Sequence, residues 1–257
     1  LSLQGVKEEA VLVLPTDERL LMLEVLGRHR NRLRKGHHAG NQFRLVIRGV
    51  RERSEDDLQQ LFDELVRRGV PNYFGPQRQG RTGTNFQLGA ELLQDAARRN
   101  KMPRNKRVWF MNAYQSHLFN RIVAKRIETI DQVFLGDWAM KSDNGACFPV
   151  EQPEAEQPRA DRFEISPTGP LFGSRAPWAT GVPGDIEREV VAELGTSPEL
   201  LSKAGAECGF RGERRALRVR LNELSWSLEG PVLTLGFWLP PGSYATSVLR
   251  EVVKKSD

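Results

Sequence analysis

The stretch RHRNRLRKGHHAGNQFRLVIRGV, residues 28–50, joins a basic run to a segment with a regular apolar pattern. In the second part Phe43, Leu45 and Ile47 recur at every second position, which is the period of a β-strand with one face in a hydrophobic core. We therefore predict a strand over residues 42–50, with dense positive charge directly upstream. The basic residues of the first part are Arg28, Arg30, Arg32, Arg34 and Lys35.

The next segment has the pattern of an amphipathic helix. Ser54 and Asp57 have the spacing of a capping box, in which each side chain accepts a hydrogen bond from the other residue's backbone. An apolar stripe at helical spacing follows, and Gly69 is placed to end the helix. The sequence predicts a helix over residues 55–68. The stripe consists of Leu58, Leu61, Phe62, Leu65 and Val66.

The composition changes at Pro71, where glycines and prolines become frequent. Beyond it we expect a helix that starts at Thr84 or Asn85 and ends at Arg99, then a basic loop over residues 100–107. Residues 149–184 are rich in Pro, Gly and acidic residues, so irregular structure is expected there. The C-terminal part reads as strands followed by a short helix from Ala245.

The totals describe a soluble chain that leans polar and basic. It has 257 residues, a net charge of +5, a pI near 9.4 and a mean hydropathy of −0.49. It lacks both an apolar run of roughly 20 residues and a signal peptide, and Cys147 and Cys208 lack the spacing of a zinc site. We expect two reduced thiols in a cytoplasmic protein without membrane partners. The chain begins with Leu1 rather than Met, so we expect it to start inside a longer polypeptide.

Four segments together resemble one protein family. They are GNQFRLVIR (40–48), GVPNYFGPQRQG (69–80), NKRVWFMNAYQSHLFNRIVAKRI (105–127) and ELSWSLEGPVLTLGFWLPPGSYATSVLREVV (223–253). In this order they resemble bacterial tRNA pseudouridine synthase D, the TruD family. The resemblance runs along almost the whole chain and is weakest over residues 129–180. One departure is Gln79, where the family pattern has Phe.

This resemblance implies an α+β fold. The family has a pseudouridine-synthase catalytic core, a mixed or antiparallel sheet with helices, with a second α/β domain inserted into it. Transferred to this chain, the core is residues 1–68 plus 217–257 and the insertion is residues 69–216. The implied activity is isomerisation of uridine 13 of tRNA to pseudouridine, without cofactor or metal, by a protein that we expect to be a monomer.

The resemblance also implies roles for Asn41 and Phe43, which match the family's Asn-x-Phe motif. Phe43 would stack on the flipped uracil, and Asn41 would hydrogen-bond near the nucleophile or ribose. The alternation rule places both residues on one strand face. Phosphate contacts are expected from the basic residues upstream and from three further cations. The expected RNA-binding residues are Arg28, Arg30, Arg32, Arg34, Lys35, His38, Arg78, Lys106 and Arg107.

The family's nucleophilic aspartate has no counterpart here, since these 257 residues contain no Lys-Asp dipeptide. Asp161, in RADRFE, superficially resembles other synthase loops but lies in the segment expected to be irregular. The 257-residue polypeptide alone is therefore predicted to be inactive. The alternative is a catalytically silent RNA-binding fragment or homologue. A ribosome-associated structural protein, a third possibility, predicts more charge and fewer aromatic residues.

Overall fold

The computed structural model describes residues 12–16, 19–23, 39–50 and 53–253. The chain divides into two compact units, residues 1–39 and residues 40–257. In the first unit, β1 (Leu12–Thr16) pairs antiparallel with β2 (Arg19–Leu23). The predicted phosphate contacts at residues 28–38 lie outside the described residues.

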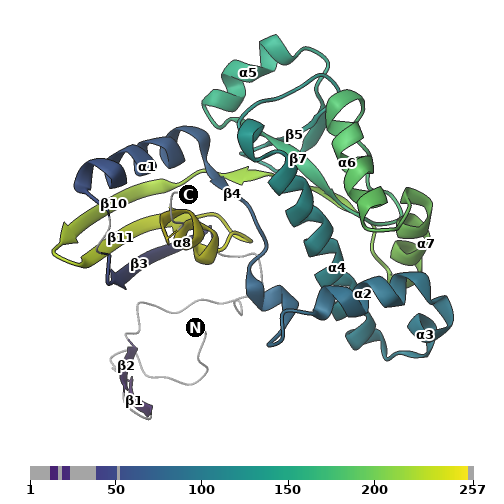
Figure 1. The fold of residues 1–257 in the computed structure, drawn as a ribbon, viewed down its shortest axis with the longest axis horizontal. Helices are drawn as coiled ribbons and strands as arrows, with labels where there is room; N and C mark the ends of the chain where they lie inside the picture. Colours follow the sequence, from purple (N-terminus) through teal and green to yellow (C-terminus); the bar gives the residue numbers. More distant parts are fainter. Residues whose placement is uncertain (1–11, 17–18, 24–38, 51–52, 254–257) are drawn as a thin grey trace, which may run out of the picture. The chain divides into compact units, whose positions relative to one another are not determined.

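The second unit contains a three-stranded antiparallel sheet in the order β10-β11-β3. These strands are β3 (Asn41–Arg48), β10 (Asn222–Glu229) and β11 (Val232–Leu239). Apolar residues of all three strands face one side, where they pack with helices α1 (Glu55–Arg68) and α8 (Ala245–Val253) (Figure 1). The strand predicted over residues 42–50 is therefore present, one residue longer at its start and two shorter at its end.

Helix α1 shows the capping box that its sequence predicts. The Ser54 Oγ accepts from the Asp57 backbone N–H at 3.1 Å, and the Asp57 carboxylate accepts from the Ser54 N–H at 3.0 Å. Leu58, Phe62 and Leu65 are buried. Gly69 ends the helix with φ +86°, a region that favours glycine, although its ψ of 164° is not that of the expected left-handed cap.

A second hydrophobic cluster surrounds helix α4, which lies against a four-stranded sheet in the order β6-β5-β7-β8 (Figure 1). The strands are β5 (Trp138–Lys141), β6 (Cys147–Pro149), β7 (Ile165–Leu171) and β8 (Glu213–Ala216). The helices are α2 (Asn85–Gln94), α3 (Ala96–Lys101), α4 (Arg104–Lys125), α5 (Pro153–Asp161), α6 (Gly181–Glu193) and α7 (Pro198–Cys208), with 3-10 turns η1 (Pro76–Gln79) and η2 (Ile127–Thr129). Both cysteines are free.

Three local expectations are wrong. Residues 149–184 contain α5, β7 and the start of α6. Pro153 is compatible with α5 because it sits in the first turn of this helix, where its missing N–H costs nothing. The expected basic loop over residues 100–107 instead holds the end of α3 and the first turn of α4, which starts after Pro103. The helix expected from residue 85 to Arg99 is broken at Asp95, whose side chain caps α3.

A pair of short strands connects the part of the chain around the three-stranded sheet with the part around α4. β4 (Val70–Pro71) pairs antiparallel with β9 (Arg218–Val219). Val70 and Val219 belong to the cluster under the three-stranded sheet, whereas Tyr73 and Leu217 belong to the cluster around α4. The two segments at which the chain passes from one cluster to the other, β4 and β9, therefore lie side by side, although they are far apart in the sequence.

Candidate functional site: a strand edge beside an arginine-lined groove

Asn41 and Phe43 lie on the same face of β3. Asn41 is opposite Leu239 in the ladder, and Phe43 is opposite Phe237, and both partners are fully buried in the apolar face. Side chains alternate along a strand, so Asn41 and Phe43 share the face that packs with α8. Asn41 is exposed and Phe43 is half-buried. One polar group and one aromatic ring thus sit two residues apart at the start of the strand.

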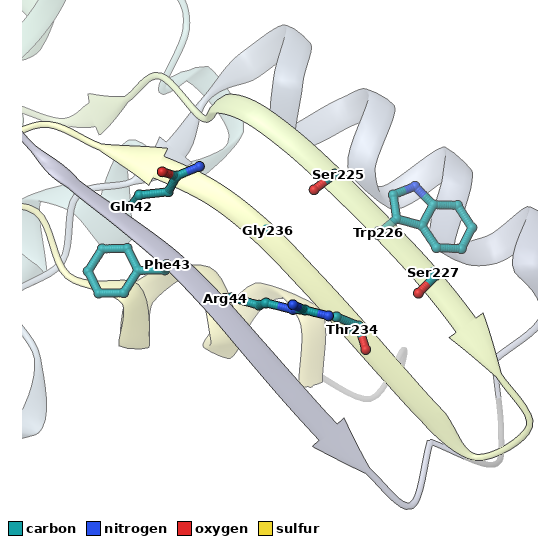
Figure 2. Close-up of a pocket in the computed structure, with 8 residues that line it drawn as sticks. All are labelled: Gln42, Phe43, Arg44, Ser225, Trp226, Ser227, Thr234 and Gly236. Carbon is teal, nitrogen blue, oxygen red and sulfur yellow. The ribbon is translucent and has the colours of Figure 1, made fainter. Parts of the chain in front are cut away.

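The ring of Phe43 packs on the core with one part of its surface and leaves another part exposed. It contacts the ring of Phe237, with ring centres 5.4 Å apart. Within the described chain β3 is the edge of its sheet, because β11 is its single strand partner there. Figure 2 shows the Phe43 ring on the opposite side of β3 from Gln42 and Arg44. This arrangement offers a flat apolar surface beside a strand edge that no other described strand pairs with.

The other face of the sheet carries a shallow polar hollow of about 590 Å³ (Figure 2). Arg44 lies on one side of it and the hydroxyls of Ser225 and Ser227 lie on the other. Gly236 keeps it open, because a Cβ at this position would lie 2.5 Å from the Ser225 Oγ. Its guanidinium and hydroxyl groups can bind an anionic or polar ligand, but none of them is a carboxylate nucleophile.

A second hollow, of about 570 Å³, runs along β8 and β9. We call it the arginine groove, because five basic residues and one acidic residue line it, Lys141, Arg214, Arg215, Arg218, Arg220 and Glu213. Aromatic residues Phe163 and Trp238 also contribute to its walls. Arg214 is neutralised by buried Glu187 at 2.8 Å. The other four basic residues outnumber Glu213, so the groove keeps an excess of positive charge. Such a surface attracts anions.

Trp238 connects the arginine groove to the start of β3. A Cβ added to Gly40 would lie 2.1 Å from the Trp238 ring, so the indole packs directly on this glycine. Gly40 immediately precedes Asn41. Trp238 is opposite Gln42 in the ladder, so the groove reaches the start of β3 on the face opposite to that of Asn41 and Phe43.

Arg215 fixes the segment around Phe74 beside the groove. Its guanidinium lies 4.1 Å from the centre of the Phe74 ring and donates to the Asn72 Oδ1 at 2.6 Å and to the Gly242 carbonyl at 3.0 Å. Burial lowers the pKa of Arg215 to about 10, and the part of the chain that the structure describes provides no carboxylate within ion-pair distance. Its positive charge is therefore not neutralised by an ion pair.

Arg218, in β9, links the end of α1 to α5. It donates to the carbonyl of Arg68, at the end of α1, at 2.7 Å and to that of Ala160, in α5, at 2.6 Å. Its guanidinium also lies over the Phe163 ring at 4.2 Å. Burial lowers the pKa of Arg218 to about 10. This side chain holds one wall of the groove against the end of α1.

The remaining expected RNA contacts are separated in the structure. Arg78 lies in η1, with its guanidinium 5.3 Å from the centre of the Phe74 ring, so it flanks the same ring as Arg215. Lys106 and Arg107 lie in the first turn of α4 and do not line either hollow. The structure therefore groups Arg78 with Arg215, and it does not bring Lys106 or Arg107 to Asn41 and Phe43.

Sequence reasoning missed Arg215, Arg218 and Trp238. The alternation of arginines in RRALRVR was visible, but it equally fits a solvated strand face. The arginines become a groove wall only through the antiparallel pairing of β9 with β4, more than 140 positions earlier in the chain, and of β8 with β7. The amide of Gln79, at the departure from the family pattern, bonds the Ala113 carbonyl and the Phe86 N–H and so links α4 to α2.

Among the described ranges 12–16, 19–23, 39–50 and 53–253, no group of three or more His, Cys, Asp or Glu side chains is arranged to hold a metal ion. In the same ranges no helix has the length and apolar character needed to cross a membrane. The features that remain are the aromatic strand edge and the arginine groove. They define an α+β protein with a basic, aromatic-walled cleft beside an open sheet edge.

Comparison with known proteins identifies the family. The family model for tRNA pseudouridine synthase D (TruD) matches residues 1–100 and 94–252. A tRNA pseudouridine synthase D of Geobacter sulfurreducens is 38% identical over 290 residues, covering 89% of this chain and 71% of the relative. One from Thermus thermophilus is 44% identical over 234 residues, covering 88% of this chain and 61% of the relative.

The fold agrees with a solved structure. The crystal structure of a candidate tRNA pseudouridine synthase D from Methanosarcina mazei superimposes with a TM-score of 0.77 over 93% of this chain and 74% of that one, at 24% sequence identity. The chain belongs to the tRNA pseudouridine synthase D family. The expected α+β fold is confirmed.

Proposed function

We propose that this chain is part of a tRNA pseudouridine synthase that isomerises uridine 13 of tRNA in the cytoplasm. The relatives carry the name tRNA pseudouridine synthase D. The observation that carries the proposal for this chain is the shared face of Asn41 and Phe43 on β3, at the end of the strand that the arginine groove reaches through Trp238 and Gly40. In this proposal the groove binds the tRNA backbone and the strand edge receives the target base.

The reaction gives each part a role. A base must leave its stack before an enzyme can reach its glycosidic bond. A carboxylate then bonds carbon 1′ of the ribose as the C–N bond breaks. The freed uracil turns, and its carbon 5 bonds carbon 1′ as the carboxylate leaves. Carbon 5 loses its proton, and nitrogen 1 gains one. The Phe43 ring stacks on the uracil, because a flat apolar surface lets the ring rotate without fixed hydrogen bonds. The Asn41 amide holds the ribose or the nucleophile in place.

The domain division follows the same proposal. Residues 1–68 and 217–257 form the catalytic core, and residues 69–216 form an inserted domain. The side-by-side crossings at β4 and β9, and the change of hydrophobic cluster across them, support this division. Arg218 then bonds carbonyls on both sides of the boundary, which favours a fixed junction at this point.

The nucleophile is proposed to come from outside these 257 residues. The family's aspartate motif has no match in them, and Asp161, at the end of α5, has its carboxylate bonded to the Gln157 amide at 2.7 Å. The same lack favours the alternative function, a catalytically silent RNA-binding module. Both functions require tRNA binding, and they differ in whether the native protein supplies the aspartate.

The experiment incubates the 257-residue polypeptide with unmodified tRNA. Binding is measured by filter retention and pseudouridine by carbodiimide treatment followed by primer extension. We expect salt-dependent binding without product. Robust turnover contradicts the proposed origin of the nucleophile, and absence of tRNA binding contradicts the proposed substrate.

A further inference from the structure

Arg78 and Arg215 lie against the same aromatic ring. The guanidinium carbon of Arg215 is 4.1 Å from the centre of the Phe74 ring, and that of Arg78 is 5.3 Å from the same centre. The two guanidinium groups are therefore separated by no more than the sum of these distances. Burial, and after it the charge of Arg78, lowers the pKa of Arg215, so the two cations repel each other.

Neither cation is neutralised within the described chain. No carboxylate of the described residues lies within ion-pair distance of Arg78 or Arg215. Glu213, the acidic residue of the arginine groove, acts on Arg215 from beyond that distance. Folding thus places two like charges on one ring without a counterion, and such an arrangement is unfavourable unless an anion binds there.

The guanidinium group of Arg215 is held on one side and free on the other. Its Nη2 donates to the Asn72 Oδ1 at 2.6 Å and to the Gly242 carbonyl at 3.0 Å, and its Nε is buried. Its Nη1 makes no hydrogen bond with any described residue. Apart from the residues next to Gly242, Nη1 is the single described atom within 4 Å of the place that a Cβ at Gly242 would take, so open space adjoins it. Nη1 is therefore an oriented donor that is free to bind a ligand.

The two arginines lie near the end of the sheet that carries Asn41. Gly242 follows Leu239, the ladder partner of Asn41, by three residues, which span at most about 11 Å. The loop that contains Gly242 leads from β11 to α8, and α8 packs on the face that Asn41 and Phe43 share. A ligand of Arg215 is therefore close to a base that stacks on Phe43.

We propose that Arg78 and Arg215 together bind one phosphate of the RNA backbone next to the target uridine and so position this nucleotide for the reaction. Guanidinium groups suit this contact, because their N–H groups match phosphate oxygens in a bidentate geometry. A phosphate bound by both groups supplies the missing counterion and offsets their repulsion. The two arginines hold the backbone and take no part in the bond changes. The inference rests on the proposed function, since it assigns a phosphate of the same tRNA.

The test uses tRNA transcripts in which a single phosphate is replaced by an uncharged methylphosphonate. Two transcripts carry the replacement on either side of uridine 13, and a third carries it in the acceptor stem. The 257-residue polypeptide should bind one of the first two about tenfold more weakly than unmodified tRNA, because a hydrogen bond to a charged group contributes this much. Its Kd for the third transcript should be unchanged.

Arg215→Gln and Arg78→Gln should each weaken the binding of unmodified tRNA by about tenfold. Both variants should also lose most of the sensitivity to that methylphosphonate, because the phosphate has already lost part of its partner. Arg215→Lys keeps the charge without the planar fork and should give an intermediate Kd. Arg211→Gln is the control, because Arg211 is exposed and lies outside the arginine groove, and it should keep the full sensitivity.

Thermal melting checks that each variant is folded. The Arg78 side chain makes no hydrogen bond with a described residue, so Arg78→Gln carries the test if Arg215→Gln does not fold. Equal methylphosphonate effects in the unmodified polypeptide and in Arg78→Gln would overturn the inference and leave the proposed function in place. The absence of an effect at both flanking phosphates would do the same. Failure of the polypeptide to bind tRNA would overturn the proposed substrate together with the inference.

Discussion

The rings of Phe43 and Phe237 lie opposite each other on neighbouring strands, with centres 5.4 Å apart and planes inclined by 32°. Phe237 is fully buried, whereas Phe43 keeps part of its surface open. The core thus fixes the orientation of Phe43 while leaving a part of the ring free. A stacking site requires such rigid support, because a mobile ring would lose its geometry.

Replacing Phe43 tests this role. In a chain that carries the family's aspartate, Phe43→Leu should lower turnover by about 10²-fold or more, since loss of alignment at a reacting group costs this much. Its free energy of unfolding should fall by less than about 1.5 kcal/mol, because Leu retains apolar bulk against Phe237. Single-turnover pseudouridine formation and urea unfolding give the two values.

Phe237→Leu is the matched control. It removes the buried ring beneath Phe43 and should lower stability by about 1 to 2 kcal/mol through lost packing. Its effect on tRNA affinity and on turnover should be smaller than that of Phe43→Leu. Equal losses of turnover in the two variants would show that the packing of the Phe43–Phe237 pair, rather than the free surface of Phe43, determines turnover.

The basic run before β3 should contribute through phosphate contacts. Changing Arg32 and Arg34 together to Ala should weaken tRNA binding and reduce the slope of log K against log salt by about 1 to 2, because each lost phosphate contact removes close to one released counterion. Filter binding between low and moderate salt measures the slope. An unchanged slope would remove these two arginines from the RNA path.

The buried ion pair of Arg126 and Asp137 should be important for stability. Two guanidinium–carboxylate bonds of 3.0 and 3.1 Å join these almost completely buried groups. Arg126→Ala leaves a buried charge without a partner and should cost about 3 to 5 kcal/mol of unfolding free energy. The control is Arg98→Ala, which breaks a half-exposed pair with Glu91 and should cost less than about 1 kcal/mol. Similar urea midpoints for the two variants would contradict this account.

His117 should make stability depend on mildly acidic pH. Its ring stacks on Phe86 with centres 4.1 Å apart, and burial, with a further contribution from Arg121, lowers the pKa of His117 below 6.5. The folded state thus resists protonation, while the unfolded chain takes up the proton as the pH falls below 6.5. This contribution to stability is full above pH 6.5 and declines as the pH falls through the lower folded pKa.

His117→Phe keeps a stacked ring and removes the titration. Urea midpoints at pH 7.5 and below 6 should therefore differ less in this variant than in the unmodified protein. An identical pH dependence in both proteins would show that the folded state accepts the His117 proton as readily as the unfolded chain does.

The sequence predicted the elements whose signals are local. Helix α1 has a capping box, an apolar stripe and a terminal glycine, and its bounds agree with the expected range. Strand β3 has a period of two, and the side-chain alternation that places Asn41 and Phe43 on one face follows from it. In both cases a few neighbouring residues determine the conformation.

The rest depended on contacts between distant residues. Pro167 and Pro170 suggested irregular structure, yet β7 is a fully buried strand between β5 and β8. The arginine groove depends on the pairing of β9 with β4 and of β8 with β7, strands that are far apart in the sequence. The exposure of Trp109 is likewise a property of packing, and the sequence alone would place an indole within a helix in the core.

The central claim is that Asn41 and Phe43 serve the isomerisation of one uridine in tRNA. The most direct measurement maps pseudouridine at every position of an unmodified tRNA, by carbodiimide treatment and primer extension, after incubation with a chain that joins these 257 residues to the family's aspartate. The account predicts a signal at position 13, which Phe43→Leu abolishes while tRNA binding persists. No pseudouridine at any position, or an undiminished signal in Phe43→Leu, would contradict it.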